Sequence, residues 1–169
     1  GDVYKRQAER AAIEYSQALD TEEGPSRVQK AKVKMFERLV YSKIKDGIGG
    51  SVWYGITGGS AMSSDLSHFF RGMGVPIYEG YGLTETCAAS CVNNKHANKV
   101  GTVGRPVNGY SARINEDGEI EFKGPGVFTK YWNNPQATEE AFTDGWFNSG
   151  DLGEICLLYT SPSPRDGLL

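Results

Sequence analysis

The feature that most constrains the fold is a pair of short apolar runs separated by one amphipathic helix pattern. The runs are Val52–Thr57 and Val75–Tyr78, and short runs of this kind are typical of strands buried in a parallel sheet. Two parallel strands need a crossover connection, usually a helix. The helix pattern consists of the candidate caps Ser63 and Ser64, followed by Leu66, Phe69, Phe70 and Met73. The sequence therefore predicts a right-handed βαβ unit and an α/β fold class.

Two helices are expected before this unit. The first spans Ala8–Asp20, and the second begins at Ser26, after the break at "TEEGPS", and ends near Gly47 or Gly49. Pro25 suits the first turn of the second helix. The apolar residues of that helix recur at steps of three and four, which predicts one buried face. This set is Val28, Ala31, Met35, Phe36, Leu39, Val40 and Ile44.

After Val100 the pattern changes to antiparallel strands. "YSARINEDGEIEFKG" alternates apolar and polar residues around Asp117-Gly118, which is a hairpin signature. Asn134 and Pro135 suit the cap and first position of a short helix, and "TDGWFNSGDLGEI" returns to a turn and a strand. The predicted organisation is a parallel-sheet α/β part at residues 8–99 and a mainly β part at residues 100–155.

The two ends of the chain do not match the sequence between them. The two ends resemble peptides translated from the two strands of a sequencing adapter. They are residues 1–7, "GDVYKRQ", and residues 156–169, which begin "CLLYTSPSPRD". An ordinary disordered terminus is the alternative explanation. We expect an adapter-derived scar at the front and an adapter-derived disordered tail at the back, so the fold is predicted from residues 8–155 alone.

The composition argues against several classes of protein. A net charge of −3 over 169 residues disfavours a nucleic-acid partner, which would select a basic face. No apolar run approaches the roughly 20 residues of a membrane-spanning helix, and no secretory signal is visible. The three cysteines suit a reducing compartment. The expected location is therefore the cytoplasm.

Three loops that follow predicted strands carry candidate functional residues. They are "TGGSAMS", "EGYGLTET" and "NSGDLGE", and ligands of open α/β sheets bind beyond the carboxyl ends of strands. Gly58 and Gly59 leave room for a flat ring against the backbone, although a plain strand-to-helix turn explains them equally well. Asp151 offers oxygens to ribose hydroxyls, or it is ordinary turn chemistry. We expect the three loops to meet in one cleft.

The second of these loops carries the richest chemistry. Gly80 and Gly82 are expected to turn the chain sharply and to hold Tyr81 outward, where its ring can stack on a base. Thr84 falls where a short helix could begin, so its hydroxyl and the nearby N–H groups suit an anion. Glu85 beside that anion suits a divalent cation. A capped helix with an exposed glutamate is the alternative interpretation.

Other polar and aromatic residues are expected to serve structure. Cys87, Cys91 and His96 lack a credible fourth ligand, so packing or surface thiols are favoured over a zinc site. Trp132 and Trp146 are expected to pack in the β part.

Three segments resemble consecutive motifs of the adenylate-forming superfamily. They are residues 54–93, with "YGITGGSAMS" and "YEGYGLTET", residues 100–107, "VGTVGRPV", and residues 118–155, with "KYWNNPQATEEAF" and "FNSGDL". Within the superfamily, "SHFFRGMGVPIYEGYGLTET" is most similar to bacterial long-chain fatty-acid–CoA ligases. The resemblance implies part of the large N-terminal domain of such an enzyme, with fatty acid, ATP and CoA as substrates and Mg²⁺ as the metal.

The resemblance also implies roles for individual residues. For the nucleotide it implies Gly58, Gly59 and Ser60 along the adenine, Tyr81 stacked on it, Asp151 on the ribose and Thr84 on the α-phosphate. Glu85 would hold Mg²⁺, so that Thr84 and Glu85 carry the catalysis. Gly80 and Gly82 would border the nucleotide and the acyl carboxylate. The residues expected at the acyl group are Gly80, Gly101, Val103 and Gly104.

On this interpretation the family's phosphate loop and its adenylation lysine lie outside the sequence, and the chain alone is expected to be inactive. Two alternatives stay open: an amino-acid or aryl-acid adenylating domain, and a non-enzymatic remnant that binds nucleotide. The resemblance is also compatible with peripheral membrane contact by the full enzyme, without a membrane-spanning segment.

Overall fold

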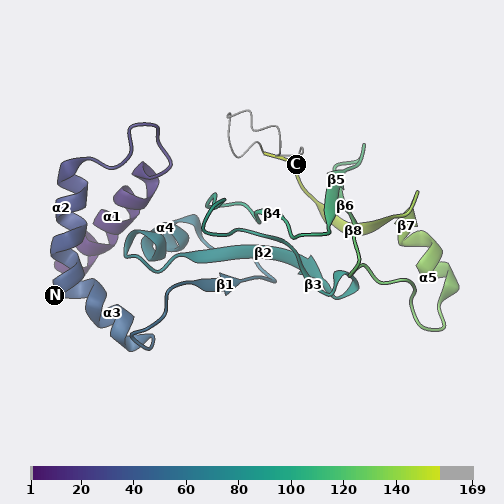
Figure 1. Cartoon of the computed structure of the whole chain (residues 1–169), viewed down its shortest axis with the longest axis horizontal. Helices are drawn as coiled ribbons and strands as arrows, with labels where there is room; N and C mark the ends of the chain where they lie inside the picture. Colours follow the sequence, from purple (N-terminus) through teal and green to yellow (C-terminus); the bar gives the residue numbers. More distant parts are fainter. Residues whose placement is uncertain (1, 157–169) are drawn as a thin grey trace. The chain divides into compact units, whose positions relative to one another are not determined.

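The structure is a computed structural model that describes residues 2–156, and its contacts divide the chain into two compact units. We call Gly1–Glu79 with Lys99–Thr102 the helical unit, and Gly80–Asn98 with the chain from Val103 onward the sheet unit. Figure 1 shows the elements of both units in chain order. The expected tail lies outside the described residues from position 157 onward. The expected division between residues 8–99 and 100–155 stays a prediction.

The helical unit begins with three helical segments. They are α1 (Asp2–Ala18), α2 (Arg27–Phe36) and α3 (Ser42–Gly47), with a π-helical turn at Glu37–Tyr41 between the last two. Ser26 caps α2 through a capping box, in which its hydroxyl accepts from the Gln29 N–H at 3.2 Å. Two expectations need correction. α1 starts at Asp2 instead of Ala8, and Pro25 precedes the cap instead of lying in the first turn.

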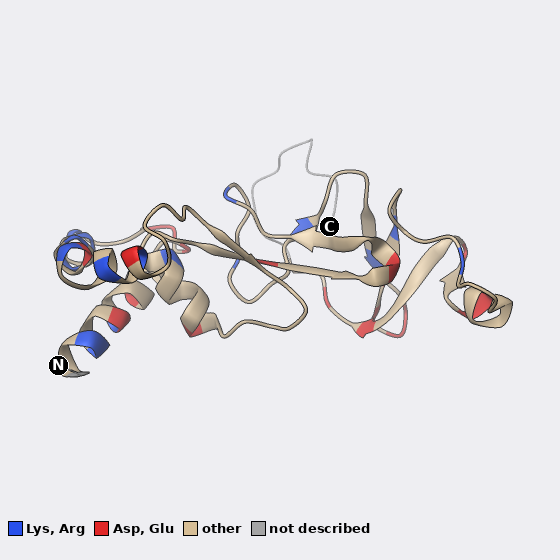
Figure 2. Cartoon of the chain, turned by 90° about the horizontal axis from the view of Figure 1, so that it is seen from below, with Lys and Arg blue, Asp and Glu red and all other residues tan. Residues whose placement is uncertain are grey.

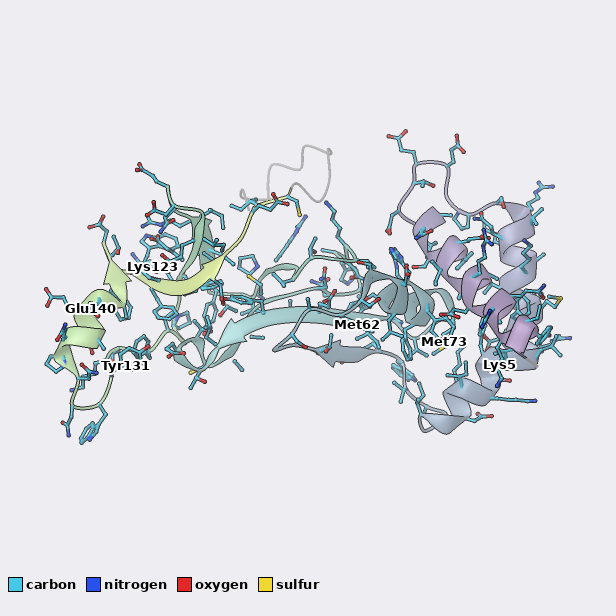
Figure 3. All side chains as sticks on the ribbon, turned by 180° about the vertical axis from the view of Figure 1, so that it is seen from behind. Lys5, Met62, Met73, Lys123, Tyr131 and Glu140 are labelled. Atoms are coloured by element: carbon cyan, nitrogen blue, oxygen red, sulfur yellow. The ribbon has the colours of Figure 1, made fainter. Side chains whose placement is uncertain are left out.

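Small residues let α1 pack closely against α4 (Ser64–Gly72). A Cβ atom built at Gly72 would lie 2.0 Å from the backbone oxygen of Ala12, so only glycine fits there. The Tyr41 hydroxyl donates to the backbone oxygen of Ala8 at 2.6 Å. The buried core of this unit is Ala8, Ala11, Ala12, Phe36, Tyr41, Met73 and Val75, and Met73 is labelled in Figure 3.

The predicted buried face of the second helix is only partly correct. Phe36 is buried and Val40 and Ile44 pack beside it, but Val28 is 64% exposed. Met35 and Leu39 are exposed as well. The residue that continues the core is Tyr41, because the π-helical turn shifts the helix face by one position relative to a regular 3.6-residue repeat.

The predicted parallel strand pair is confirmed. β1 (Gly55–Thr57) pairs in parallel with the start of β2 (Ile77–Leu83), with Ile56 opposite Tyr78. The helix α4 connects the two strands along the chain. The expected burial of β1 is wrong, since Ile56 is 66% exposed and its two neighbours in the strand are only half-buried.

The second half of β2 belongs to the sheet unit and pairs antiparallel with β3 (Ala88–Val92), which pairs with β4 (Arg105–Pro106). A second sheet has the order β5-β6-β8-β7. Its strands are β5 (Ser111–Ile114), β6 (Glu119–Lys123), β7 (Phe142–Thr143) and β8 (Trp146–Leu152).

Turn and cap chemistry places the strands of this second sheet. Asp117-Gly118 closes the β5–β6 hairpin as predicted, with Gly118 at φ +85°. Asn134 caps α5 (Pro135–Glu140) by accepting from the Ala137 N–H at 3.1 Å, as predicted. The sheet packs around a core centred on Cys91, Phe122 and Phe147.

The two tryptophans of the sheet unit behave differently. Trp146 is half-buried, and the Arg113 guanidinium lies 4.4 Å from the centre of its ring. Trp132 is 85% exposed, so its expected packing role is wrong. Figure 2 shows Lys and Arg alongside Asp and Glu on the helices of the helical unit. Every helix among residues 2–156 is too short or too polar to cross a bilayer.

Candidate functional site

Gly80 and Gly82 lie inside strand β2, and this corrects the expected sharp turn. A Cβ at Gly82 would lie 1.6 Å from the Ala88 backbone oxygen, and one at Gly80 would lie 3.1 Å from that of Cys91. The pairing register of β2 with β3 shifts between Tyr81 and Gly82. Gly82 is therefore required for close approach of two strands at an irregular pairing, and Gly80 makes a tight contact there; neither glycine reverses the chain.

Tyr81 projects from this irregular strand into contact with the second sheet of its unit. Its ring stacks on Phe122 at 5.8 Å between centroids, and its hydroxyl donates a hydrogen bond to the Asp151 carboxylate. Burial, followed by this hydrogen bond, raises the pKa of the Tyr81 phenol. The structure thus brings Tyr81 and Asp151 together. The ring is half-buried instead of held fully outward.

Asp151 lies near the end of strand β8, where the sequence suggested a loop. Asp151 is exposed, as expected, and the preceding Gly150 has φ +79°. The Gly150 N–H donates to Glu119 Oε1 at 2.7 Å, and the Asp151 N–H donates to Ser149 Oγ at 3.2 Å. These two contacts therefore fix the backbone immediately before the Asp151 Cα atom, which carries the candidate ribose ligand.

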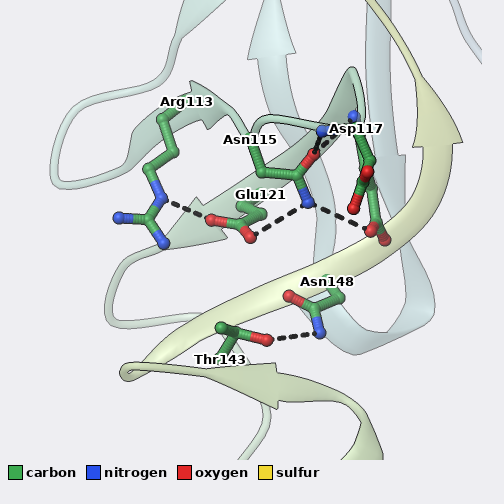
Figure 4. Close-up of polar contacts among 7 residues, drawn as sticks. Arg113, Asn115, Asp117, Glu121, Thr143 and Asn148 are labelled. Carbon is green, nitrogen blue, oxygen red and sulfur yellow. Dashed lines mark hydrogen bonds and ion pairs between the residues drawn. The ribbon is translucent and has the colours of Figure 1, made fainter.

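A polar cluster at the β5–β6 hairpin extends this support. The Asn115 amide donates to Glu119 at 3.4 Å and to Glu121 at 3.3 Å, and Arg113 forms an ion pair with Glu121 (Figure 4). The Asn115 Oδ1 atom accepts from the backbone N–H groups of Asp117 and Glu119. Sequence reasoning missed this cluster, although an asparagine two residues before Asp-Gly is a recognisable turn signal.

Thr84 opens a single 3₁₀ turn, Thr84–Thr86, as the sequence predicts for a short helix. The Leu83 N–H donates to Thr86 Oγ1 at 3.0 Å, and Cys87 ends the turn with φ 54°. The Thr84 side chain is exposed. The turn is thus fixed from within by Thr86, which leaves the Thr84 hydroxyl outside that internal hydrogen bonding.

Glu85 is held at two points by the chain before α5. Its backbone oxygen accepts from the Phe128 N–H at 2.7 Å, and its Oε1 atom accepts from the Tyr131 hydroxyl at 2.9 Å. The Glu85 carboxylate, as hydrogen-bond acceptor, raises the pKa of the Tyr131 phenol. Glu85 is half-buried, which differs from the exposed glutamate of the alternative interpretation. Tyr131 was missed, because a residue 46 positions away gives no local signal.

The segment expected along the adenine belongs to the helical unit. Gly58, Gly59 and Ser60 are exposed in the turn that follows β1, and Gly59 has φ +84°. The Met62 N–H donates to a Glu79 carboxylate oxygen at 2.8 Å within the same unit. The expected meeting of this segment with Tyr81, Glu85 and Asp151 stays a prediction, since those residues belong to the sheet unit.

Of the residues expected at the acyl group, Gly80 lies in β2, and the other three lie on the segment before β4. Gly101 and Gly104 both have positive φ, at 82° and 80°, and Val103 is 39% exposed. A Cβ at Gly104 would lie 2.2 Å from the Asn93 backbone nitrogen, so this glycine is needed for close packing within the sheet unit. Their role toward an acyl group stays a prediction.

The two candidate cysteines, Cys87 and Cys91, differ in their exposure. Within residues 2–156, no three His, Cys, Asp or Glu side chains gather as candidate ligands. Burial raises the pKa of the Cys91 thiol to about 11, which suits a packed and unreactive side chain. Cys87 is exposed. Cys91 is therefore a packed thiol and Cys87 a surface thiol, the two kinds of position that the sequence analysis favoured.

Comparison with known proteins matches the chain to one protein family and to several relatives. The family model described as AMP-binding enzyme matches residues 16–132. The long-chain-fatty-acid–CoA ligase FadD15 of Mycobacterium bovis is 47% identical over 148 residues, covering 88% of this chain and 24% of the relative. The long-chain-fatty-acid–CoA ligase 3 of Saccharomyces cerevisiae is 38% identical over 129 residues, covering 69% and 19%. The chain spans about a quarter of the length of the first relative.

A solved structure with a related fold is that of O-succinylbenzoate coenzyme A synthetase from Bacillus subtilis, in complex with ATP and magnesium ion. It is 32% identical, with a TM-score of 0.56, and the match covers 60% of this chain and 24% of that one. The N-terminal domain of FACL13 from Mycobacterium tuberculosis matches with 33% identity, a TM-score of 0.55, and coverage of 61% and 29%.

Proposed function

Because the chain belongs to the AMP-binding enzyme family, we propose that it forms part of a ligase that joins long-chain fatty acids to CoA at the expense of ATP. The observation that best supports a nucleotide site is the hydrogen bond between Tyr81 and Asp151, which places an aromatic ring beside a carboxylate. The likeness to fatty-acid–CoA ligases supports the acyl class.

The proposed reaction has two steps. In the first, a fatty carboxylate oxygen attacks the α-phosphorus of ATP, and pyrophosphate leaves with the electron pair of the broken P–O bond. In the second, the CoA thiol, after losing its proton, attacks the acyl carbonyl and AMP leaves. The products are acyl-CoA, AMP and pyrophosphate.

Tyr81 and Asp151 are proposed to hold the nucleoside. One face of the Tyr81 ring packs on Phe122, so the opposite face is the one that can stack on adenine. The Asp151 carboxylate accepts the Tyr81 hydroxyl and keeps acceptor capacity for ribose hydroxyls. Gly58, Gly59 and Ser60 are proposed along the adenine, with Gly80 and Gly82 bordering the nucleotide.

Thr84 and Glu85 are proposed at the phosphates. The Thr84 hydroxyl donates to an α-phosphate oxygen, and Glu85 offers a hard carboxylate oxygen that fits Mg²⁺. Among the described residues, the hydrogen bond to Glu85 from Tyr131 uses Oε1 only, so Oε2 can serve as the ligand. Mg²⁺, when bound, neutralises charge on the phosphates.

The acyl carboxylate is proposed to lie beside Gly80, Gly101, Val103 and Gly104. The proposed partners are fatty acid, ATP and CoA, without nucleic acid. The proposed location is the cytoplasm, with peripheral membrane contact by the longer enzyme.

A chimera tests the function. Residues 8–155 replace the matching segment of the M. bovis relative, and pyrophosphate release is measured with ATP, Mg²⁺ and palmitate. We expect turnover from the chimera and none from the 169-residue chain alone, because the chain spans about a quarter of the length of that relative and pyrophosphate must be held by several precisely placed groups. Preference for benzoate or an amino acid over palmitate would favour another adenylating class. A folded but inactive chimera would favour a nucleotide-binding remnant.

A further inference from the structure

The segment between β6 and α5 donates hydrogen bonds to both the backbone and the side chain of Glu85. Phe128 N–H donates to the Glu85 backbone oxygen at 2.7 Å, and the Tyr131 hydroxyl donates to Glu85 Oε1 at 2.9 Å. We propose that Tyr131 is a positioning residue, whose hydroxyl orients the Glu85 carboxylate toward the metal. This inference rests on the proposed function only for the statement that Glu85 is a metal ligand.

Tyr131 is itself fixed by its neighbours. Its ring packs on Phe128 with 4.6 Å between centroids. Its backbone N–H donates to Thr138 Oγ1 at 3.0 Å, and the Thr138 hydroxyl donates to the Asn134 backbone oxygen at 2.8 Å. Figure 3 shows Tyr131 on the segment that leads into α5. The first turn of that helix therefore anchors the phenol, and the phenol has a fixed position from which to donate.

The chemistry of a phenol suits this task. A hydrogen bond to an ionised carboxylate is shorter and stronger than one between neutral groups, so it restricts the rotation of the flexible glutamate chain. It engages Oε1 and leaves Oε2 for a cation. The donor is neutral, so it adds no positive charge that would repel a metal, as a lysine or arginine at this position would. Partners of metal ligands typically contribute about 10–100-fold in metal affinity.

The chain offers a matched control for removal of this hydroxyl. The Tyr110 hydroxyl donates to the backbone oxygen of Thr86 at 2.7 Å, in the same 3₁₀ turn that carries Glu85. Tyr110→Phe therefore removes a phenol hydrogen bond to the turn without touching the Glu85 carboxylate. Tyr131→Phe retains the ring packing on Phe128 and removes only the bond to that carboxylate.

The experiment uses the chimera described above and two readouts. Mn²⁺ binding in the presence of a non-hydrolysable ATP analogue is measured by electron paramagnetic resonance, and the Mg²⁺ concentration for half-maximal pyrophosphate release is measured by assay. We expect Tyr131→Phe to weaken Mn²⁺ binding by about 10-fold or more, with less than about threefold change for Tyr110→Phe. The Mg²⁺ requirement should rise in parallel, while the KM for ATP at saturating Mg²⁺ changes little.

Glu85→Gln separates this inference from the function on which it rests. If Glu85→Gln impairs Mn²⁺ binding while Tyr131→Phe matches Tyr110→Phe, the positioning role is wrong and the metal role of Glu85 stands. If Glu85→Gln has no effect, both are wrong. In the Glu85→Gln background, Tyr131→Phe should cause no further loss. Should Tyr131→Phe fail to fold, Thr138→Val, which removes the anchor of the Tyr131 backbone, must weaken Mn²⁺ binding in the same direction or the proposal is overturned.

Discussion

The helical unit and the sheet unit hold their candidate residues by different means. In the helical unit, Gly58–Ser60 form an exposed turn, and the unit is held together by close contact of small residues such as Gly72 and Ala12. In the sheet unit, Tyr81 and Glu85 each hydrogen-bond to a side chain distant in the sequence. The comparison indicates that close packing of small residues stabilises the helical unit. In the sheet unit, polar side-chain contacts hold the candidate functional residues in position.

The largest effect is expected from a polar change in the sheet unit that alters no volume. Glu85→Gln in the chimera should lower the rate of pyrophosphate release by about 100-fold or more, because a carboxylate that holds the metal stabilises charge in the transition state. Binding of ATP should weaken far less. The rate is measured with palmitate at saturating ATP, and the affinity by calorimetry. Small and equal losses in the rate and in the ATP affinity would indicate that Glu85 has only a structural role.

The helical unit should respond instead to added volume. Gly72→Ala places a Cβ atom 2.0 Å from the Ala12 backbone oxygen, so α1 and α4 must separate. We expect the free energy of unfolding to fall by about 3 kcal/mol, as measured by urea titration with helical circular dichroism.

Gly59→Ala is the matched control in the same unit. Nothing lies within 4 Å of a Cβ at this position, and the only cost is the positive φ of 84°. That cost is about 1–2 kcal/mol. A Gly72→Ala protein as stable as Gly59→Ala would contradict the close packing of α1 on α4 and weaken the comparison between the units.

Sequence reasoning predicted the elements better than it predicted their exposure. The parallel β1–β2 pair, the Asp117-Gly118 hairpin and the Asn134 cap all follow from local signals, and all are confirmed. The burial of Val28 and Ile56 was predicted wrongly. A periodic apolar pattern marks a face that can be covered, but the sequence does not state what covers it.

The candidate site shows the same division between local and distant information. The 3₁₀ turn at Thr84 could be predicted from residues next to it. The strand character of Gly80 and Gly82 could not, because it depends on how closely Ala88 and Cys91 approach from β3. Contacts such as the one between Glu85 and Tyr131 arise from tertiary packing, which a single sequence does not reveal.

Substitutions of Tyr81 test how much its hydrogen bond to Asp151 contributes to ATP binding, in addition to the stacking of its ring. Tyr81→Ala in the chimera should weaken ATP binding by about 1–2 kcal/mol, the scale of a lost aromatic stack. Tyr81→Phe retains the ring on Phe122 and loses the hydroxyl that donates to Asp151. We expect it to weaken binding less than Tyr81→Ala, as measured by calorimetry with an ATP analogue. Equal losses for both would show that the hydroxyl, and not the ring, carries the contribution.

The smallest expected effect returns to the helical unit, where one polar contact joins two packed helices. His68 Nδ1 lies 3.0 Å from the hydroxyl of the buried Ser16. Burial lowers the pKa of His68, and Arg71 adds to this effect, while Asp20 and Asp65 oppose it. The unfolded histidine, with a pKa of about 6.5, therefore binds a proton more readily than the folded one.

The sign of the pH dependence follows from that difference. The contribution of His68 to stability is complete above the unfolded pKa of about 6.5, and it is lost as the pH falls through the lower folded pKa. The chain has two histidines, so His96→Gln leaves a single imidazole signal for ¹³C-edited NMR titration. We expect its midpoint in the folded chain to lie below its midpoint in concentrated urea, and His68→Gln to flatten the stability profile below pH ~6.5. A folded midpoint at or above the unfolded one would mean that the neighbouring carboxylates outweigh burial, and that charge as well as packing controls this unit.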